Sequence, residues 1–294
     1  MRRTLRGIIA VMSTPLNEDE SLDVAALKRM LDYVVAGGVH GVWVLGSGGE
    51  LPNLDPAQAR RTIEVAVETV NGRVPVVVGV GHPGTRMTIA AAQEAARMGA
   101  DMVNVVPPYY YAYSEEQSVR HYRMVLENVD APLVIYRRGE PPLSLGALER
   151  ICQHENVAGI KDVPTEFRVF QRMVAALGPM GVGVMTAAGR LIHPAVAVGG
   201  HGAVTVEAAI APELCVAIYD AARESDNTRA AELQQKLYHL SNVLQVPPDH
   251  VSGRPKAALS LLGLCKPTVT APFAPVDERV MTEMREALKA IDLL

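Results

Sequence analysis

The sequence predicts an α/β protein, a (β/α)8 or TIM barrel with a C-terminal helical extension. Short apolar runs alternate eight times with longer amphipathic stretches. Most of these runs are continuously apolar, which is typical of parallel strands covered on both faces. Eight strand-then-helix units favour a closed barrel over an open doubly wound sheet, and no Gly-x-Gly-x-x-Gly motif opens the first helix.

The expected elements follow one another along the chain without a low-complexity linker. The strands are expected at residues 7–12, 41–45, 75–80, 102–106, 133–136, 157–161, 183–186 and 203–206. The barrel helices are expected at 22–35, 55–70, 85–98, 119–128, 149–153, 166–177, 191–198 and 212–223. Asp55 before Pro56 and the run from Ser114 to Gln117 are typical helix starts. From residue 227 the pattern is purely helical, at 227–246, 254–262 and 277–291, so we divide the chain into a barrel (1–224) and an extension (225–294).

Composition excludes several classes of protein. The chain has 294 residues, 49% of them hydrophobic and 20% charged, which is typical of a globular protein. Its net charge of −4 predicts neither a nucleic-acid partner nor a membrane surface partner. Cys152, Cys215 and Cys265 form no disulfide or zinc pattern, so we expect a reducing cytoplasm. No apolar run is long enough for a transmembrane helix.

Reactive side chains stand where several expected strands end, the edge at which barrel enzymes place their active sites. Lys161 closes the apolar run 157–160, and desolvation there would lower its pKa and free the amine as a nucleophile. Such an amine attacks a carbonyl carbon to form a Schiff base. Tyr136 ends the neighbouring strand, where its phenol could relay a proton.

Other strand ends carry groups suited to binding an anion. The Gly-rich run 46–49 exposes backbone N–H groups that could hold a carboxylate, and Ser47 adds a hydroxyl. Arg137 and Arg138 could bind the distal part of such a substrate. The eight histidines show no metal-ligand spacing, which disfavours a metal-dependent aldolase. Five of the nine tyrosines gather after the fourth and fifth strands.

The order and spacing of these motifs resemble the dihydrodipicolinate synthase / N-acetylneuraminate lyase family of class I aldolases over nearly the whole chain. The motifs are Ser13-Thr14-Pro15-Leu16, Gly46-Ser47-x-Gly49-Glu50, Pro108-Tyr109-Tyr110, Ile135-Tyr136, Gly159-Ile160-Lys161-Asp162, Gly199-Gly200-x-Gly202 and Lys256-Ala257-Ala258-Leu259 with Leu261-Leu262-Gly263. The resemblance implies a TIM barrel with a helical tail, and a tetramer built from dimers.

The resemblance also implies roles for individual residues. Lys161 matches the Schiff-base lysine and Tyr136 the proton-relay tyrosine. Tyr110 matches the tyrosine that reaches across a dimer interface into the neighbouring site. Ser47, with the amides of Ser47 and Gly48, would hold the carboxylate of a pyruvate-like keto acid. We also expect Val204, on the eighth strand, to contact the substrate.

Two departures from the family pattern bear on the substrate. Gly48 stands where the family usually has Thr, and the residues from Gly139 to Pro142 lack the Arg that dihydrodipicolinate synthases use for the aldehyde partner. We therefore expect a Schiff-base lyase, an aldolase or dehydratase, acting without a cofactor on pyruvate or a 2-keto-3-deoxy sugar acid such as 5-dehydro-4-deoxyglucarate. The alternatives are a synthase that condenses pyruvate with aspartate semialdehyde, and a non-catalytic paralogue that binds a keto acid.

Overall fold

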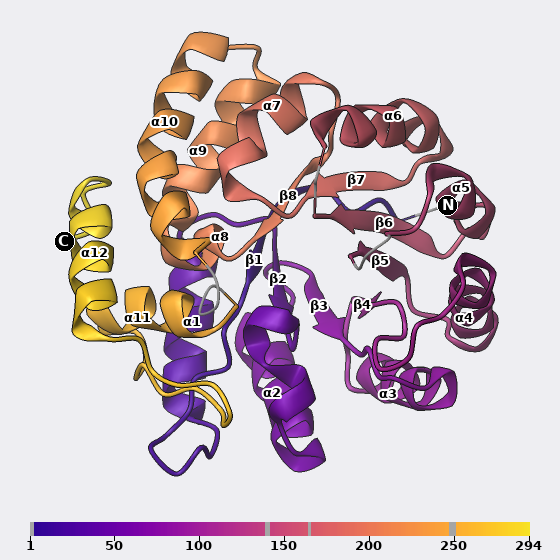
Figure 1. The fold of residues 1–294 in the computed structure, drawn as a ribbon, viewed down its shortest axis with the longest axis horizontal. Helices are drawn as coiled ribbons and strands as arrows, with labels where there is room; N and C mark the ends of the chain where they lie inside the picture. The colour runs from indigo at the N-terminus through magenta and orange to yellow at the C-terminus, as the bar shows by residue number, and fades with distance from the viewer. Residues whose placement is uncertain (1–2, 139–141, 164–165, 247–250) are drawn as a thin grey trace.

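Parallel strands paired in chain order form a closed barrel at the centre of the protein (Figure 1). The computed structural model describes residues 3–138, 142–163, 166–246 and 251–294. Most of the segment that lacks the Arg expected of a synthase, Gly139–Pro141, therefore lies outside the described residues. Each strand pairs with the next, and β8 pairs back with β1, which confirms the predicted fold class. The strands are β1 (Gly7–Val11), β2 (Gly41–Val44), β3 (Val76–Gly79), β4 (Met102–Val105), β5 (Leu133–Arg137), β6 (Val157–Asp162), β7 (Gly183–Thr186) and β8 (Gly202–Thr205).

Helices cover the outside of the barrel, and further helices follow it (Figure 1). They are α1 (Val24–Ala36), α2 (Pro56–Val70), α3 (Thr85–Arg97), α4 (Glu115–Asn128), α5 (Leu145–Cys152), α6 (Phe167–Leu177), α7 (Ile192–Ala197), α8 (Glu207–Ile210), α9 (Pro212–Arg223), α10 (Asn227–Leu244), α11 (Gly253–Leu261) and α12 (Glu278–Lys289). Asp55 and Ser114 cap α2 and α4 in capping boxes, as the sequence predicts. The short α8 was not predicted, and α5 begins earlier than the predicted residue 149 because the Ser144 side chain caps it at Leu145.

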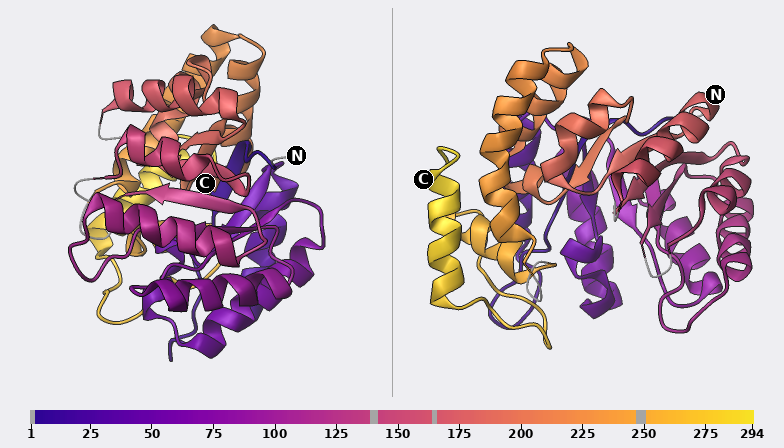
Figure 2. Two further views of the ribbon diagram at one scale, coloured as in Figure 1. Left: turned by 90° about the vertical axis from the view of Figure 1, so that its right-hand side faces the viewer. Right: turned by 45° about the horizontal axis from the view of Figure 1, so that its top comes forward.

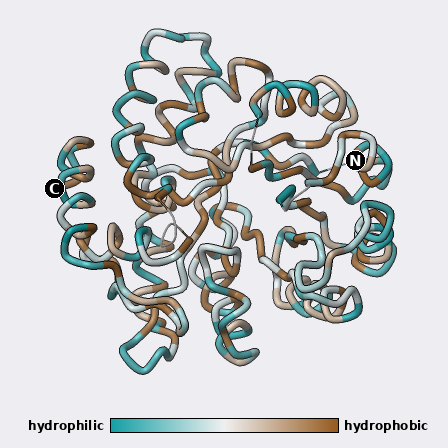
Figure 3. The backbone as a smooth tube through the Cα atoms, in the orientation of Figure 1, coloured by the Kyte–Doolittle hydropathy of each residue, from teal (hydrophilic) through white to brown (hydrophobic). Residues whose placement is uncertain are grey.

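Apolar side chains fill two separate layers, because successive residues of a strand point to opposite faces. Ile9, Trp43, Val134 and Met185 belong to the cluster inside the barrel. Their neighbours in the same strands, such as Ile8 and Ile135, pack outward against the helices in a larger cluster. Figure 3 shows the result as apolar central strands surrounded by helices with polar outer turns.

The C-terminal helices form an added layer on one side of the barrel. α10 packs against α9 and α7, and α12 packs against α10 and α11. Figure 2 shows α12 on the outer side of α10 in a second orientation. Within the described ranges, no helix combines the length and apolar character needed to span a membrane.

Candidate active site

Lys161 and Tyr136 face each other across neighbouring strands, because β5 and β6 pair in a register that sets Tyr136 beside Lys161. The Lys161 Nζ lies 4.4 Å from the centroid of the Tyr136 ring and 4.9 Å from that of Trp43. Lys161 is only 7% exposed. The amine therefore lies between two aromatic rings inside the barrel, and Trp43 is a site residue that the sequence analysis treated only as part of a strand.

This environment favours the neutral, nucleophilic form of the amine. Burial lowers the pKa of Lys161, and the charge of Arg138 lowers it further. The Tyr136 phenol and the Glu207 carboxylate act in the opposite direction without reversing the shift. A larger fraction of Lys161 is thus deprotonated at neutral pH than for a lysine in water.

The phenol of Tyr136 is perturbed in a direction that suits proton transfer. Burial by itself raises the pKa of Tyr136, but the charges of Lys161 and Arg138 and the hydrogen bonds with Ser47 and Lys161 outweigh it. The net pKa is lower than that of a free tyrosine. A phenol with a lowered pKa gives up and takes back a proton more readily near neutral pH.

A cavity of about 730 Å³ opens beside Tyr136 at the carboxyl ends of the strands, and Lys161 is not among its lining residues. Ser47, Tyr136 and Arg138 are among the residues that line it, together with Tyr109, Tyr111 and Tyr113. An Arg138 Nη1 donates to the Ser47 Oγ at 3.0 Å, and its guanidinium lies 5.6 Å from the centre of the Tyr136 ring. The Ser47 loop, Tyr136 and the Arg138 cation therefore share one mouth, as the strand ends predict.

The Ser47 loop is a single 3-10 turn (Ser47–Gly49). Leu45, two residues before the turn, and Glu50, directly after it, both have left-handed backbone. A Cβ added to Gly48 would lie 3.5 Å from its nearest neighbours, an ordinary van der Waals distance. The glycine is thus not required by the backbone. Gly48 is buried, and a side chain there would lie against Val11 and Val206.

Glu50 ties this loop to the C-terminal extension. The Lys256 Nζ lies 2.6 Å from the Glu50 Oε1, and both side chains are fully buried. Ser252 also donates to Oε1, while the Thr270 N–H and hydroxyl donate to Oε2 at 2.8 and 2.7 Å. Burial opposes ionisation of Glu50, but the Lys256 charge and the hydrogen bonds from Lys256, Ser252 and Thr270 together outweigh it, and the pKa of Glu50 is lowered. Sequence reasoning placed Glu50 and Lys256 in separate motifs and assigned them no contact.

The substrate-binding role expected for Arg137 needs correction. Its guanidinium donates to the Asp162 carboxylate at 2.7 Å and to the Leu143 carbonyl at 2.9 Å, and both members of the ion pair are buried. The reason is the alternation of a strand: Tyr136 points into the barrel, so Arg137 points out toward the helices. Of the two arginines, only Arg138 is among the residues that line the cavity.

Two other expected site residues remain predictions. Val204 is fully buried in the interior cluster, where it pairs with Ile9 of β1, so contact with a substrate is not established. Tyr110 is 75% exposed and packs edge-on against Tyr111. The role expected for Tyr110, reaching across a dimer interface into the neighbouring site, requires a second subunit.

Glu207 lies buried close enough to raise the pKa of Lys161, and sequence reasoning missed it. The Thr205 and Ser241 hydroxyls both donate to its carboxylate, the latter at 2.9 Å. Its position two residues after the end of β8 was the available signal, since carboxyl ends of strands carry barrel chemistry.

Comparison with known proteins decides the family. Residues 4–291 match the model of the Dihydrodipicolinate synthetase family. The chain belongs to this family. Dihydrodipicolinate synthetase relatives with matched lengths include a DapA-like lyase of Halobacterium salinarum, 35% identical over 99% of this chain and 95% of the relative. A 4-hydroxy-tetrahydrodipicolinate synthase of Acidiphilium cryptum is 32% identical over 98% and 99% of the two chains.

Solved structures of the dihydrodipicolinate synthetase family share the fold. YagE, a prophage protein of this family from E. coli K12 solved in complex with pyruvate, superposes with a TM-score of 0.93 at 27% identity over 99% of both chains. Dihydrodipicolinate synthase from Thermotoga maritima gives a TM-score of 0.94 at 27% identity over 99% of this chain and 100% of its own. The protein is thus a lyase of the dihydrodipicolinate synthetase family.

Proposed function

We propose that the protein acts on pyruvate or a 2-keto-3-deoxy sugar acid, as an aldolase or dehydratase, through a Schiff base on Lys161. The observation that carries the proposal is the position of the Lys161 amine, buried between the Tyr136 and Trp43 rings with a lowered pKa. A neutral amine at the mouth of a barrel is the group that such chemistry requires.

In the proposed reaction, the Lys161 amine attacks the C2 ketone of the substrate, and Tyr136 passes the protons that turn the carbinolamine into an iminium and water. The iminium withdraws electrons from C3. In the dehydratase route, C3 loses a proton to give an enamine, which expels the protonated C4 hydroxyl as water and leaves a conjugated iminium. In the aldolase route, the C4 hydroxyl loses a proton and the C3–C4 bond breaks, which releases an aldehyde and leaves an enamine; a proton then returns to C3 and restores an iminium. In either route water adds to the iminium carbon, which frees the keto acid and regenerates the Lys161 amine. No cofactor takes part in this scheme.

We place the substrate carboxylate at the Ser47 loop, where the hydroxyl, the loop amides and the Arg138 guanidinium are donors. The bound pyruvate of YagE, a relative of the same fold, supports a pyruvate-like portion of the substrate. The cavity volume of about 730 Å³ is within the range of pockets for small organic ligands and leaves room for a longer chain.

A condensing synthase is the second candidate, and the name of the Acidiphilium cryptum relative favours it. Turnover of pyruvate with aspartate semialdehyde would establish this activity. Turnover of 2-keto-3-deoxy sugar acids, monitored as pyruvate release or as loss of water, would establish the aldolase or dehydratase activity. A protein that binds keto acids reversibly and turns over none of these compounds would instead be the non-catalytic paralogue.

Reduction with borohydride in the presence of pyruvate tests the Schiff base. We expect mass spectrometry to find one reduced pyruvate adduct, on Lys161, and none in the Lys161→Ala variant. Lys266→Ala, which removes a half-exposed lysine that pairs with Glu18, should keep the full adduct. An adduct that persists in Lys161→Ala, or its absence from the unmodified protein, contradicts the proposal.

We further propose a cytoplasmic homotetramer built from dimers. Tyr109, Tyr110 and Tyr111 expose aromatic rings beside the mouth, the composition of many subunit contacts. All three cysteines are buried, and Cys215 and Cys265 form no disulfide, in keeping with a reducing compartment. One dihydrodipicolinate synthase variant of the same fold is described as monomeric, so sedimentation of the purified protein is the measurement that decides.

A further inference from the structure

A second cavity, of about 490 Å³, lies at the end of the barrel away from the active site. Arg6 comes directly before β1, and His201 directly before β8, so both mark the amino-terminal end of the strands. Tyr219 and Arg223 come from the last turns of α9. No residue of this cavity belongs to the catalytic mouth.

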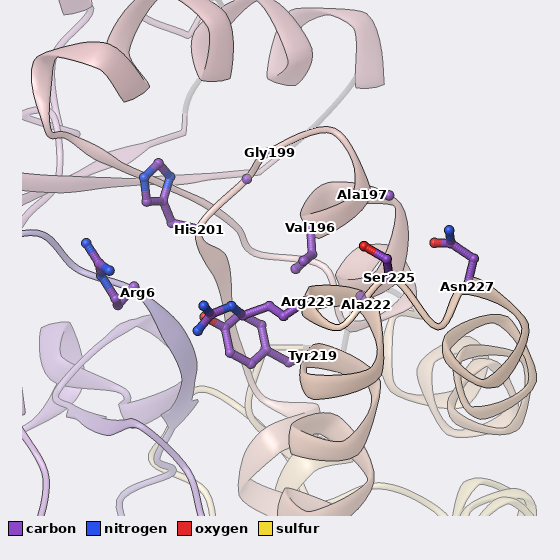
Figure 4. A pocket seen from close by; sticks show the side chains of 11 residues that line it. Arg6, Val196, Ala197, Gly199, His201, Tyr219, Ala222, Arg223, Ser225 and Asn227 are labelled. Carbon is purple, nitrogen blue, oxygen red and sulfur yellow. The ribbon is translucent and has the colours of Figure 1, made fainter.

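The charge of this cavity is positive. Arg6 and Arg223 line it, and no Asp or Glu is among its lining residues. Within the ranges that the structure describes, neither arginine forms an ion pair with a carboxylate. Figure 4 shows Arg223 reaching past Tyr219 toward the side of the pocket where Arg6 and His201 lie. Its guanidinium lies 5.7 Å from the centre of the Tyr219 ring.

The other polar groups of the cavity are hydrogen-bond donors as well. The His201 Nδ1 accepts from the Val184 N–H at 3.2 Å, so the ring proton of the neutral imidazole is on Nε2. The Asn227 Oδ1 pairs with the His193 Nε2 at 3.1 Å, which leaves the amide N–H groups of Asn227 unassigned. Ser225 adds a hydroxyl.

We propose that this cavity binds a phosphate group carried on a small organic molecule. Two guanidinium groups match the charge of a phosphate dianion, and their planar N–H donors suit its oxygens. The His201 imidazole and the Asn227 amide add further donors to the lining. The Tyr219 ring and the apolar Val196 and Ala222 side chains supply a wall for the organic part. The volume fits a small ligand better than a lone ion.

Calorimetric titration of the full chain tests the site, with glucose 6-phosphate, inorganic phosphate and glucose as the probes. We expect saturable binding of glucose 6-phosphate at one site, weaker binding of inorganic phosphate and none of glucose. Raising the salt concentration should weaken the binding. Arg6→Gln and Arg223→Gln should each reduce affinity at least about tenfold, the loss expected when a charged donor to phosphate is removed.

Matched variants separate this site from the active site. Arg285→Gln removes the same charge from the exposed face of α12 and should leave the affinity unchanged. Lys161→Ala should bind glucose 6-phosphate as the unmodified protein does, whether or not the Schiff-base proposal holds. The site is refuted if no phosphate compound binds, if Arg6→Gln and Arg223→Gln bind normally while remaining folded by circular dichroism, or if binding is lost in Lys161→Ala.

Discussion

At the scale of single residues, Arg138 contributes to the pKa shifts of both Lys161 and Tyr136. Its charge lowers the pKa of Lys161 and that of Tyr136. Replacing Arg138 by Gln should therefore raise both pKa values, because a nearby cation no longer disfavours the ammonium or favours the phenolate. The acid limb of kcat/KM against pH, which reports free-enzyme groups, should move to higher pH. KM for the keto acid should rise about tenfold as a charged donor is lost.

Arg190 offers the matched control for this prediction, since it is exposed after β7 and is not among the residues lining the catalytic cavity. Arg190→Gln should leave the acid limb unchanged. An Arg138→Gln enzyme whose acid limb stays in place would show that Arg138 does not act on Lys161.

At the scale of elements, two glycines in turns near the mouth should respond differently to an added methyl group. Gly48→Ala should change stability by less than about 1 kcal/mol, because the new Cβ meets its neighbours at ordinary distance. Gly189→Ala would place a Cβ 2.5 Å from the Glu207 Cδ. Glu207 is held by the Thr205 and Ser241 hydroxyls and cannot swing away freely. We expect a loss of about 1–3 kcal/mol, measured by urea unfolding.

Equal stabilities for the two glycine variants would mean that the Glu207 carboxylate has room to move. In that case its hydrogen bonds would not fix its distance from Lys161. The comparison thus tests the rigidity of the turn after β7 as well as the packing of a single residue.

At the scale of the whole molecule, the Glu50–Lys256 pair joins the Ser47 loop to the C-terminal extension. Lys256→Met should destabilise the protein by about 3–5 kcal/mol, because it leaves a carboxylate buried without its cation. Glu50→Gln combined with Lys256→Met should recover part of that loss in urea unfolding. The single variant should also lose activity, since Glu50 directly follows the Ser47 turn. A double variant no more stable than Lys256→Met would contradict the pairing argument.

The fold was predictable because its signals are local. Continuous apolar runs such as Val76–Gly79 and helix caps such as Asp55 and Ser114 identify elements within a few residues. The meeting of Tyr136 with Lys161 also followed, since parallel strands end at one edge.

The parts that were missed depend on tertiary context. Glu50 and Lys256 lie far apart in the chain, and nothing in either local pattern indicates that they are buried together. The prediction that Arg137 binds substrate was wrong. Successive residues of a strand point to opposite faces, so Arg137 points away from the face of Tyr136 and pairs with Asp162.

The pairing of β1 with β8 has a consequence during synthesis of the chain. An unpaired strand edge is a template for joining another chain, and a closed ring offers none. The ring cannot close before Thr205, the end of β8, has been made. At about 5–20 residues per second, the growing chain keeps an open edge on β1 for on the order of ten to forty seconds. The risk of aggregation is therefore concentrated in the nascent protein, before the last strand reaches the first.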